Sequence, residues 1–179
     1  MSLAALLAAA LLPPPVVIMN PRGPGWGQGC LIGPDTAITA WHVVSELPEM
    51  RWVSPRSNAV GVAEIIGTEK KKDIATIRLL GAVILPVAPR MKHPKVRPGD
   101  RLRFPFSSNN VRDGLLVGLV IGTSHEDPNQ VFVDLAAFSG MSGACAVNDA
   151  GEIVGIVQQV AWDDKNPQMR SVGIIRLLK

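Results

Sequence analysis

The sequence contains no tyrosine, and phenylalanine and tryptophan together make up only 4% of its 179 residues. Nucleic-acid-binding domains combine clustered cations with aromatic side chains that stack on bases. Here the net charge is only +3, and the basic runs at 70–72 and between Arg90 and Arg103 contain no aromatic residue. We therefore interpret these runs as solvated surface and expect no nucleic-acid partner.

Cysteine is also scarce, since Cys30 and Cys145 are the only two and lie far apart in the chain. They show neither a C-x-x-C motif nor Cys/His ligand spacing, which excludes a disulfide-rich scaffold and predicts no metal site. Two such cysteines are more often free buried thiols, although one bridge is possible. The redox compartment, and with it the localisation (secreted, periplasmic or cytoplasmic), stays open.

Long hydrophobic runs are limited to the N-terminal segment 1–15, in which Leu3 to Leu12 are all leucine or alanine. Ten residues are too few to cross a bilayer as a helix. The run has the length of a signal-peptide core, but no Lys or Arg precedes it and three prolines follow. It is equally compatible with a short helix docked on the body of the protein, so membrane association stays open.

No long amphipathic helix is predicted, and the rest of the chain consists of short β-branched segments separated by Gly, Pro, Asn and Asp at intervals of about ten residues. This pattern predicts an all-β protein with two six-stranded halves. The halves are residues 16–89 and 99–179, and the Pro-, Lys- and Arg-rich stretch 90–98 is the expected connection. The twelve predicted strands are 16–19, 28–32, 36–39, 51–54, 60–67, 74–79, 101–104, 115–121, 130–135, 144–147, 153–160 and 171–175.

Three residues in this pattern are candidates for catalysis. His42 follows a predicted strand, and histidine is the residue type best suited to act as a general base. Asp73 opens an apolar strand, where a carboxylate needs a partner such as an imidazole N–H. Ser142 lies between glycines, whose backbone freedom lets the N–H groups of Gly140 and Ser142 converge on a carbonyl oxygen as an oxyanion hole. Each residue alone has an ordinary structural explanation.

The order of the three residues is more informative than any one of them. The α/β-hydrolases present the nucleophile first, then the acid, then histidine. No histidine follows Ser142 in this chain, which excludes that arrangement for this serine. The remaining histidines, His93 in the connection and His125 in a polar loop, are predicted to be exposed surface residues.

In this order the motifs resemble those of the chymotrypsin-fold, trypsin-like serine proteases, nearest to the protease domain of the bacterial Deg-type (high-temperature-requirement) branch. The similarity covers about residues 25 to 176. The similar segments are 27–32 (GQGCLI), 38–44 (ITAWHVV), 73–79 (DIATIRL), 97–102 (RPGDRL), 134–143 (DLAAFSGMSG) and 151–156 (GEIVGI).

The resemblance implies a chymotrypsin-like double six-stranded β-barrel with the active site in the cleft between the barrels. It also implies a triad of His42, Asp73 and Ser142 that hydrolyses a protein or peptide substrate through an acyl-enzyme, without a metal or organic cofactor. Met141 stands where the digestive enzymes have an aspartate, so their zymogen switch is not expected here. No PDZ domain is expected after Lys179.

In this family the specificity pocket is lined by the residues just before the nucleophile in sequence and by the strand that follows it. The resemblance implies the same two walls here. The walls are Ala136, Ala137 and Phe138 on one side and Ile156, Val157 and Gln158 on the other. No acidic residue lies at the expected pocket base, so we expect a small or apolar P1 side chain. The alternative function is a latent or non-catalytic binding module that a partner activates. The sequence does not give the oligomeric state.

Overall fold

The computed structural model describes residues 12–22, 25–81, 95–108, 111–136, 138–161 and 171–178. These residues form twelve strands, one short α-helix and one 3₁₀ turn. The first six strands are β1 (Val16–Met19), β2 (Trp26–Leu31), β3 (Thr36–Ala40), β4 (Met50–Ser54), β5 (Ala59–Glu69) and β6 (Ile74–Leu80). The second six are β7 (Arg101–Phe106), β8 (Gly114–Thr123), β9 (Gln130–Asp134), β10 (Cys145–Val147), β11 (Ile153–Ala161) and β12 (Val172–Leu177). The helix is α2 (Trp41–Val44) and the 3₁₀ turn is η1 (Lys70–Lys72).

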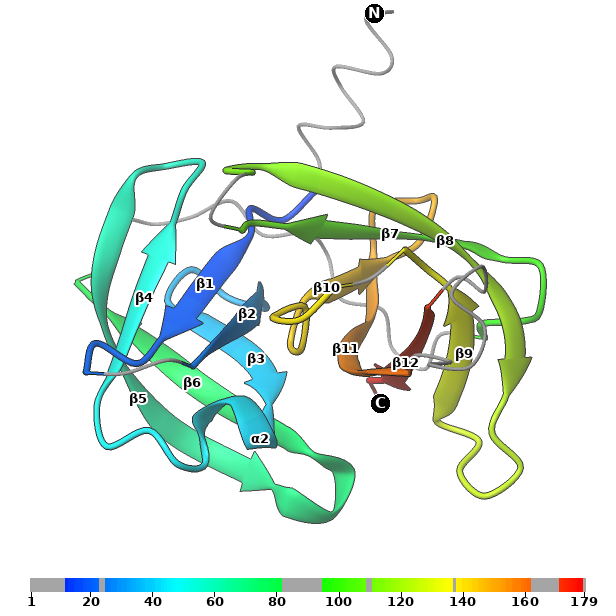
Figure 1. Cartoon of the computed structure of the whole chain (residues 1–179), viewed down its shortest axis with the longest axis horizontal. Coiled ribbons are helices and arrows are strands. Elements are labelled where there is room, and N and C mark those ends of the chain that lie inside the picture. The colour runs from blue at the N-terminus through cyan, green and yellow to red at the C-terminus, as the bar shows by residue number, and fades with distance from the viewer. Residues whose placement is uncertain are drawn as a thin grey trace, which may run out of the picture.

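Each set of six strands closes into an antiparallel barrel, with the orders β1-β2-β3-β6-β5-β4 and β10-β11-β12-β9-β8-β7. The two barrels lie side by side, and β2 faces β10 at the centre of the molecule (Figure 1). Closure leaves no unpaired sheet edge in either barrel. The all-β, double six-stranded architecture predicted from the sequence is confirmed.

Most strands alternate buried and exposed side chains, as expected when one face of a sheet is packed inside a barrel. In β9, for example, Val131 and Val133 are buried and their neighbours are half-buried. The exposed face of β8 carries Leu115, Val117, Leu119 and Ile121, followed by Thr123. Most of this face is thus apolar.

The buried side chains form three clusters, one inside each barrel and one between them. Trp52 is among the largest in the first barrel, and Phe104 in the second. The third cluster joins Ile38 and Ile74 of the first barrel to Ile153 and Ile156 of the second. The contact between the barrels is therefore a hydrophobic core in its own right.

Cys30 and Cys145 lie inside this inter-barrel cluster and form a disulfide between β2 and β10, with a Cα–Cα distance of 4.7 Å. The sequence left the state of these cysteines open, and the structure joins them across 115 residues of chain. Both side chains are buried, at 0% and 3% exposure. The bridge ties the two barrels together covalently.

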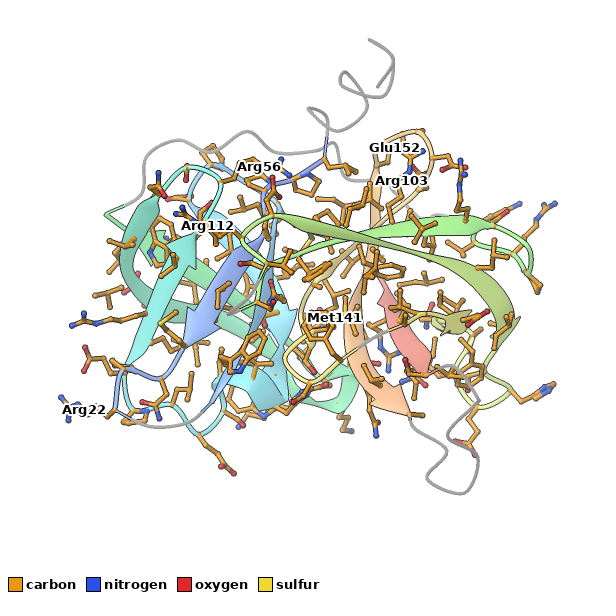
Figure 2. All side chains as sticks on the ribbon, turned by 45° about the horizontal axis from the view of Figure 1, so that its top comes forward. Arg22, Arg56, Arg103, Arg112, Met141 and Glu152 are labelled. Atoms are coloured by element: carbon orange, nitrogen blue, oxygen red, sulfur yellow. A yellow bond between two sulfur atoms is a disulfide. The ribbon has the colours of Figure 1, made fainter. Side chains whose placement is uncertain are left out.

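A second set of contacts joins the barrels at one edge. Arg56, between β4 and β5, forms a bidentate ion pair with Asp113, which precedes β8. Arg56 also donates a hydrogen bond to the carbonyl of Leu12. Arg112 donates to the side chain of Asn58 nearby. Figure 2 shows Arg56 and Arg112 close to each other at this edge.

The N-terminal segment and the connection are only partly described. Leu12 is buried in the inter-barrel cluster, but residues 1–11 lie outside the described residues, as do 82–94, which include part of the predicted connection 90–98. The expectations for these segments stay predictions. Across the described ranges, no helix is long and apolar enough to span a membrane.

The disulfide gives a first testable prediction. The double variant Cys30→Ala/Cys145→Ala loses a cross-link that closes a loop of 115 residues, so its free energy of unfolding is expected to fall by about 2–5 kcal/mol. Urea unfolding of oxidised wild type and the double variant measures this difference. Wild type unfolded with a reductant present serves as control and should behave like the variant. Equal stability of oxidised wild type and variant would contradict the prediction.

Candidate active site

His42 is positioned by the end of β3. This strand runs into α2 at Trp41, and its last residue, Ala40, is paired in register with Ile74 at the start of β6. Asp73 immediately precedes Ile74, so the pairing brings the two chain ends together. The Trp41 N–H donates to the Asp73 carbonyl at 3.1 Å, which fixes the start of the helix beside the aspartate.

Asp73 is held by the 3₁₀ turn that precedes it. The residue adopts a left-handed conformation with φ of 53°, and its N–H donates to the Lys70 carbonyl at 3.1 Å. This conformation is uncommon outside glycine, and aspartate is one of the residues that tolerates it best. The Lys70 ammonium also lies 4.9 Å from the centre of the Trp41 ring, a cation–π contact between the turn and α2.

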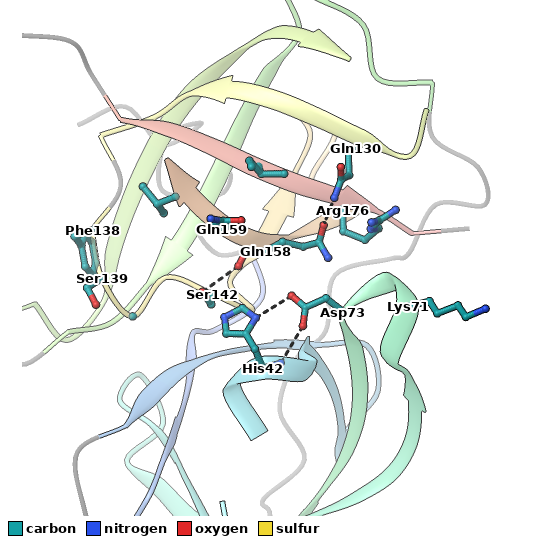
Figure 3. A pocket seen from close by; sticks show the side chains of 13 residues that line it. His42, Lys71, Asp73, Gln130, Phe138, Ser139, Ser142, Gln158, Gln159 and Arg176 are labelled. Carbon is teal, nitrogen blue, oxygen red and sulfur yellow. Dashed lines mark hydrogen bonds and ion pairs between the residues drawn. The ribbon is translucent and has the colours of Figure 1, made fainter. Parts of the chain in front are cut away.

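The two side chains form a close pair. Asp73 Oδ2 lies 2.8 Å from His42 Nδ1, and Asp73 Oδ1 accepts the backbone N–H of His42 at 2.9 Å. A carboxylate at Nδ1 holds the proton on that nitrogen and leaves Nε2 free to accept another. The imidazole is about half exposed, so Nε2 is open to the cleft between the barrels (Figure 3).

Ser142 comes from the other barrel, on the loop that connects β9 to β10. Gly140 and Gly143 on either side have φ of 93° and 88°, which only glycine adopts without strain. The Ser142 hydroxyl donates to the Gln158 carbonyl at 3.1 Å. Among the described residues no hydrogen bond joins this hydroxyl to His42, although both side chains line the same cleft (Figure 3).

The serine loop also carries two backbone donors. Between residues that the structure describes, no hydrogen bond uses the N–H of Gly140 or of Ser142. The next N–H groups along the chain are paired, since Gly143 donates to Val157 and Ala144 to Met141. The predicted oxyanion pair thus consists of donors that the described fold leaves available.

These groups line a cleft of about 650 Å³. Its lining includes all three candidate triad residues, together with Gly140 of the serine loop. The other lining residues are Lys71, Gln130, Phe138, Ser139, Gln158, Gln159, Val160, Ile174 and Arg176.

Only part of the predicted specificity wall on β11 lines the cleft. Phe138 and Gln158 line the cleft as expected, but Ile156 and Val157 are fully buried in hydrophobic clusters and do not line it. The register with β12 shifts between Val157 and Gln159, so the cleft-facing part of β11 starts only at Gln158.

The wall before the nucleophile also differs from the prediction. Ala136 is exposed and does not line the cleft, and Ala137 lies outside the described residues. Phe138 packs edge-on against Phe106, with ring centres 5.0 Å apart. This leaves Phe138 as the residue that lines the cleft on that side.

Several residues that line the cleft were missed from the sequence. Gln130, Gln159, Val160 and Ile174 give no local signal, because each occurs in an ordinary strand pattern. Arg176 does give one, since it is a single cation within the apolar strand β12. A charge in such a strand indicates a buried partner.

A model of the trypsin-like peptidase domain matches residues 27–156, which is more than half of the chain. The chain belongs to this family. The peptidase domain is 31% identical over 140 residues to "Serine protease HTRA1" of Xenopus laevis, covering 73% of this chain and 30% of that protein. It is 30% identical over 141 residues to "Probable periplasmic serine endoprotease DegP-like" of Pseudomonas savastanoi pv. phaseolicola, covering 75% of this chain and 29% of that protein. The chain thus spans about 30% of the length of these curated relatives.

A solved serine endoprotease from Yersinia pestis has the same fold as this peptidase domain. The TM-score is 0.79 at 20% sequence identity, and the match covers 99% of this chain and 63% of that one. The resemblance to Deg-type proteases that the sequence motifs indicated is confirmed over the protease domain.

Behind the cleft of the peptidase domain, Arg176 forms an ion pair with Asp127, which lies between β8 and β9. The guanidinium is only 6% exposed and the carboxylate 33%. The Arg176 hydrogen bond, helped by the N–H of Asn129, holds the pKa of Asp127 below its ordinary value of 3.8. The pair anchors the β8–β9 loop to β12 at the back of the cleft.

Removing the carboxylate is expected to destabilise the peptidase domain. Asp127→Asn leaves the buried Arg176 charge without its partner, so the free energy of unfolding at neutral pH should fall by about 1–3 kcal/mol, a range that allows for the partial exposure of the carboxylate. Because the pKa of Asp127 is lower in the folded state, its contribution is present above about pH 4 and is lost as the pH falls through the folded value.

Urea unfolding of both proteins from pH 7 to pH 3 tests this. The difference should shrink on acidification, and a difference that stays constant to pH 3 would show that the carboxylate charge does not matter. Asp149→Asn is the matched control, because Asp149 pairs with Arg101 and Arg103 but is half exposed. Its effect should stay below about 0.5 kcal/mol.

Proposed function

We propose that the peptidase domain is a serine endopeptidase with a triad of His42, Asp73 and Ser142. The observation that carries this proposal is the oriented His42–Asp73 pair, at 2.8 Å, in one cleft with a serine whose loop has two N–H groups that no hydrogen bond between described residues uses. A base, its orienting carboxylate, a nucleophile and a candidate oxyanion hole are the parts that acyl transfer needs. The relatives are named as serine proteases, which agrees with this chemistry.

In the proposed reaction Ser142 Oγ attacks the carbonyl carbon of the scissile peptide bond and its proton passes to His42 Nε2. The N–H groups of Gly140 and Ser142 stabilise the resulting oxyanion. The C–N bond then breaks, and His42 returns the proton to the leaving amine. Water attacks the acyl-enzyme with His42 again accepting the proton, which releases the acid and restores Ser142.

One rearrangement precedes this chemistry. The Ser142 hydroxyl donates to the Gln158 carbonyl in the free protein, so it must give up this hydrogen bond to donate to His42. Nucleophile–base hydrogen bonds are often long or misaligned before substrate binds.

The cleft favours uncharged or apolar P1 side chains. Phe138, Val160 and Ile174 supply apolar surface, while Lys71 places positive charge in the lining and the charge of Arg176 is neutralised by Asp127. Among the described lining residues the only carboxylate is that of Asp73, which already pairs with His42. A lysine or arginine at P1 would meet like charge without a free carboxylate to offset it.

A latent peptidase that a partner switches on is the second candidate. It is favoured by the Ser142 hydrogen bond to Gln158, which leaves the nucleophile unpaired with its base in the free protein. The same labelling experiment separates the two candidates, because an armed serine reacts without a partner and a latent one does not.

A fluorescent fluorophosphonate probe tests the triad directly, since it reacts with activated serines regardless of substrate. Wild type is expected to label, while Ser142→Ala should show no labelling and His42→Ala should label at least ~10³-fold more slowly, because triad members act as a unit. Gel fluorescence after timed reaction measures this, with circular dichroism as the control for folding. A folded wild type that does not label would support the latent form.

A second experiment tests the P1 preference. A fluorogenic peptide series that varies only P1 should give kcat/KM values for Ala, Val or Leu at least about tenfold above those for Lys or Arg. Lys71→Gln is the matched variant, because it removes one positive charge from the cleft lining. Faster cleavage after Lys or Arg in wild type would show that the cleft does not exclude cations.

A further inference from the structure

Gln28 is a buried polar residue at the centre of the contact between the barrels. It lies on β2 between Gly27 and Gly29, two residues from the disulfide cysteine Cys30, and is only 1% exposed. A primary amide in such a place is costly unless it is hydrogen-bonded, since its desolvation is not otherwise compensated. The hydrogen-bond partners of Gln28 therefore show which segments it holds together.

The side-chain amide crosses to the second barrel. Gln28 Nε2 donates to the Ser107 carbonyl at 2.8 Å, and the Ser107 N–H donates back to Gln28 Oε1 at 3.3 Å. The same Nε2 also donates to the Gly140 carbonyl at 3.3 Å. One amide thus connects the residue after β7 to the serine loop.

The backbone of Gln28 holds the same loop at a second point. Its N–H donates to the Ser142 carbonyl at 2.7 Å, and its own carbonyl accepts the Thr39 hydroxyl at 2.7 Å. The carbonyls of Gly140 and Ser142 are both fixed by Gln28, one by its side chain and one by its backbone. The peptide units that contain these two carbonyls, 140–141 and 142–143, lie on either side of the unit 141–142 that carries the proposed Ser142 donor, and the first of them is next to the unit 139–140 that carries the proposed Gly140 donor.

The loop needs such restraint because no side chain limits the backbone dihedrals φ and ψ of its glycines. Gly140 has φ of 93°, a region in which glycine moves at little cost. The space around it is also closely filled, since a Cβ at Gly140 would lie 2.3 Å from the Trp26 ring and one at Gly143 would lie 2.0 Å from the Gln28 carbonyl. The packing prevents a side chain at these positions, and hydrogen bonds from Gln28 hold the peptide units 140–141 and 142–143.

We propose that Gln28 is a positioning residue for the oxyanion hole: from the first barrel it holds the carbonyls of Gly140 and Ser142, and so restrains the peptide units on both sides of the one that carries the Ser142 N–H and next to the one that carries the Gly140 N–H. This inference rests on the proposed function for its effect on catalysis. Its structural part, the fixing of the loop by Gln28, does not depend on it.

The kinetic test uses Gln28→Met, which keeps the side-chain length and removes both hydrogen-bonding groups. With the fluorophosphonate probe, kinact is expected to fall at least tenfold while KI changes less than twofold, because misplaced oxyanion donors slow bond formation and not probe binding. A merely destabilising substitution would not produce this split. Gln28→Glu, which keeps the Oε1 acceptor and loses the donor when ionised, replaces Gln28→Met if the latter does not fold.

Arg56→Met is the matched control, because Arg56 also joins the two barrels through several hydrogen bonds but lies at the far edge, away from the serine loop. It should keep the wild-type kinact. A wild-type kinact in the Gln28 variant, or an equal loss in Arg56→Met, would overturn the inference.

Hydrogen–deuterium exchange of the peptide covering residues 138–144 tests the structural part without relying on activity. The paired amides of Met141, Gly143 and Ala144 in this segment are expected to exchange at least tenfold faster in Gln28→Met than in wild type and to be unchanged in Arg56→Met. Unchanged exchange in the Gln28 variant would overturn the inference even if wild type fails to label. Failure of labelling together with faster exchange would refute the proposed enzyme and keep the positioning role.

Discussion

The contact between the two barrels is the constraint on which the proposed active site depends, because neither barrel holds all three residues of the proposed triad. His42 and Asp73 belong to the first barrel and Ser142 to the second. A shift of about 1 Å between reacting groups can cost two orders of magnitude in rate. The hydrophobic cluster between the barrels supplies the stability of the contact, but apolar packing alone sets relative position loosely.

Directional bonds across the same contact set the position. Gln28 reaches from the first barrel to the serine loop, and Gln158 reaches in the opposite direction, donating to the Lys72 carbonyl at 2.7 Å next to Asp73. Each amide holds backbone adjacent to a catalytic residue of the other barrel. The Gln158 side chain is itself fixed by Gln130 at 2.8 Å, so the polar groups form a connected network and not isolated bonds (Figure 3).

The sequence predicted the features that depend on local pattern. The alternation and turn residues predicted twelve strands in two halves, with β1 correct at both ends, and the family resemblance predicted that the halves are barrels. The order of His42, Asp73 and Ser142 led to residues that line one cleft. Ile156 and Val157, predicted for the specificity wall, do not line this cleft, and the strand register shifts at that part of β11. Register shifts come from pairing with another strand and leave no local signal.

The disulfide has a consequence for how such a protein can be controlled. Cys30 and Cys145 are buried in the inter-barrel cluster, so while the bond is intact the barrels cannot separate at this point. Many two-lobed enzymes are switched by domain closure. Here the cross-link opposes a change that would open the shared core, whereas the serine loop and its neighbours lie outside that core and can move without breaking it.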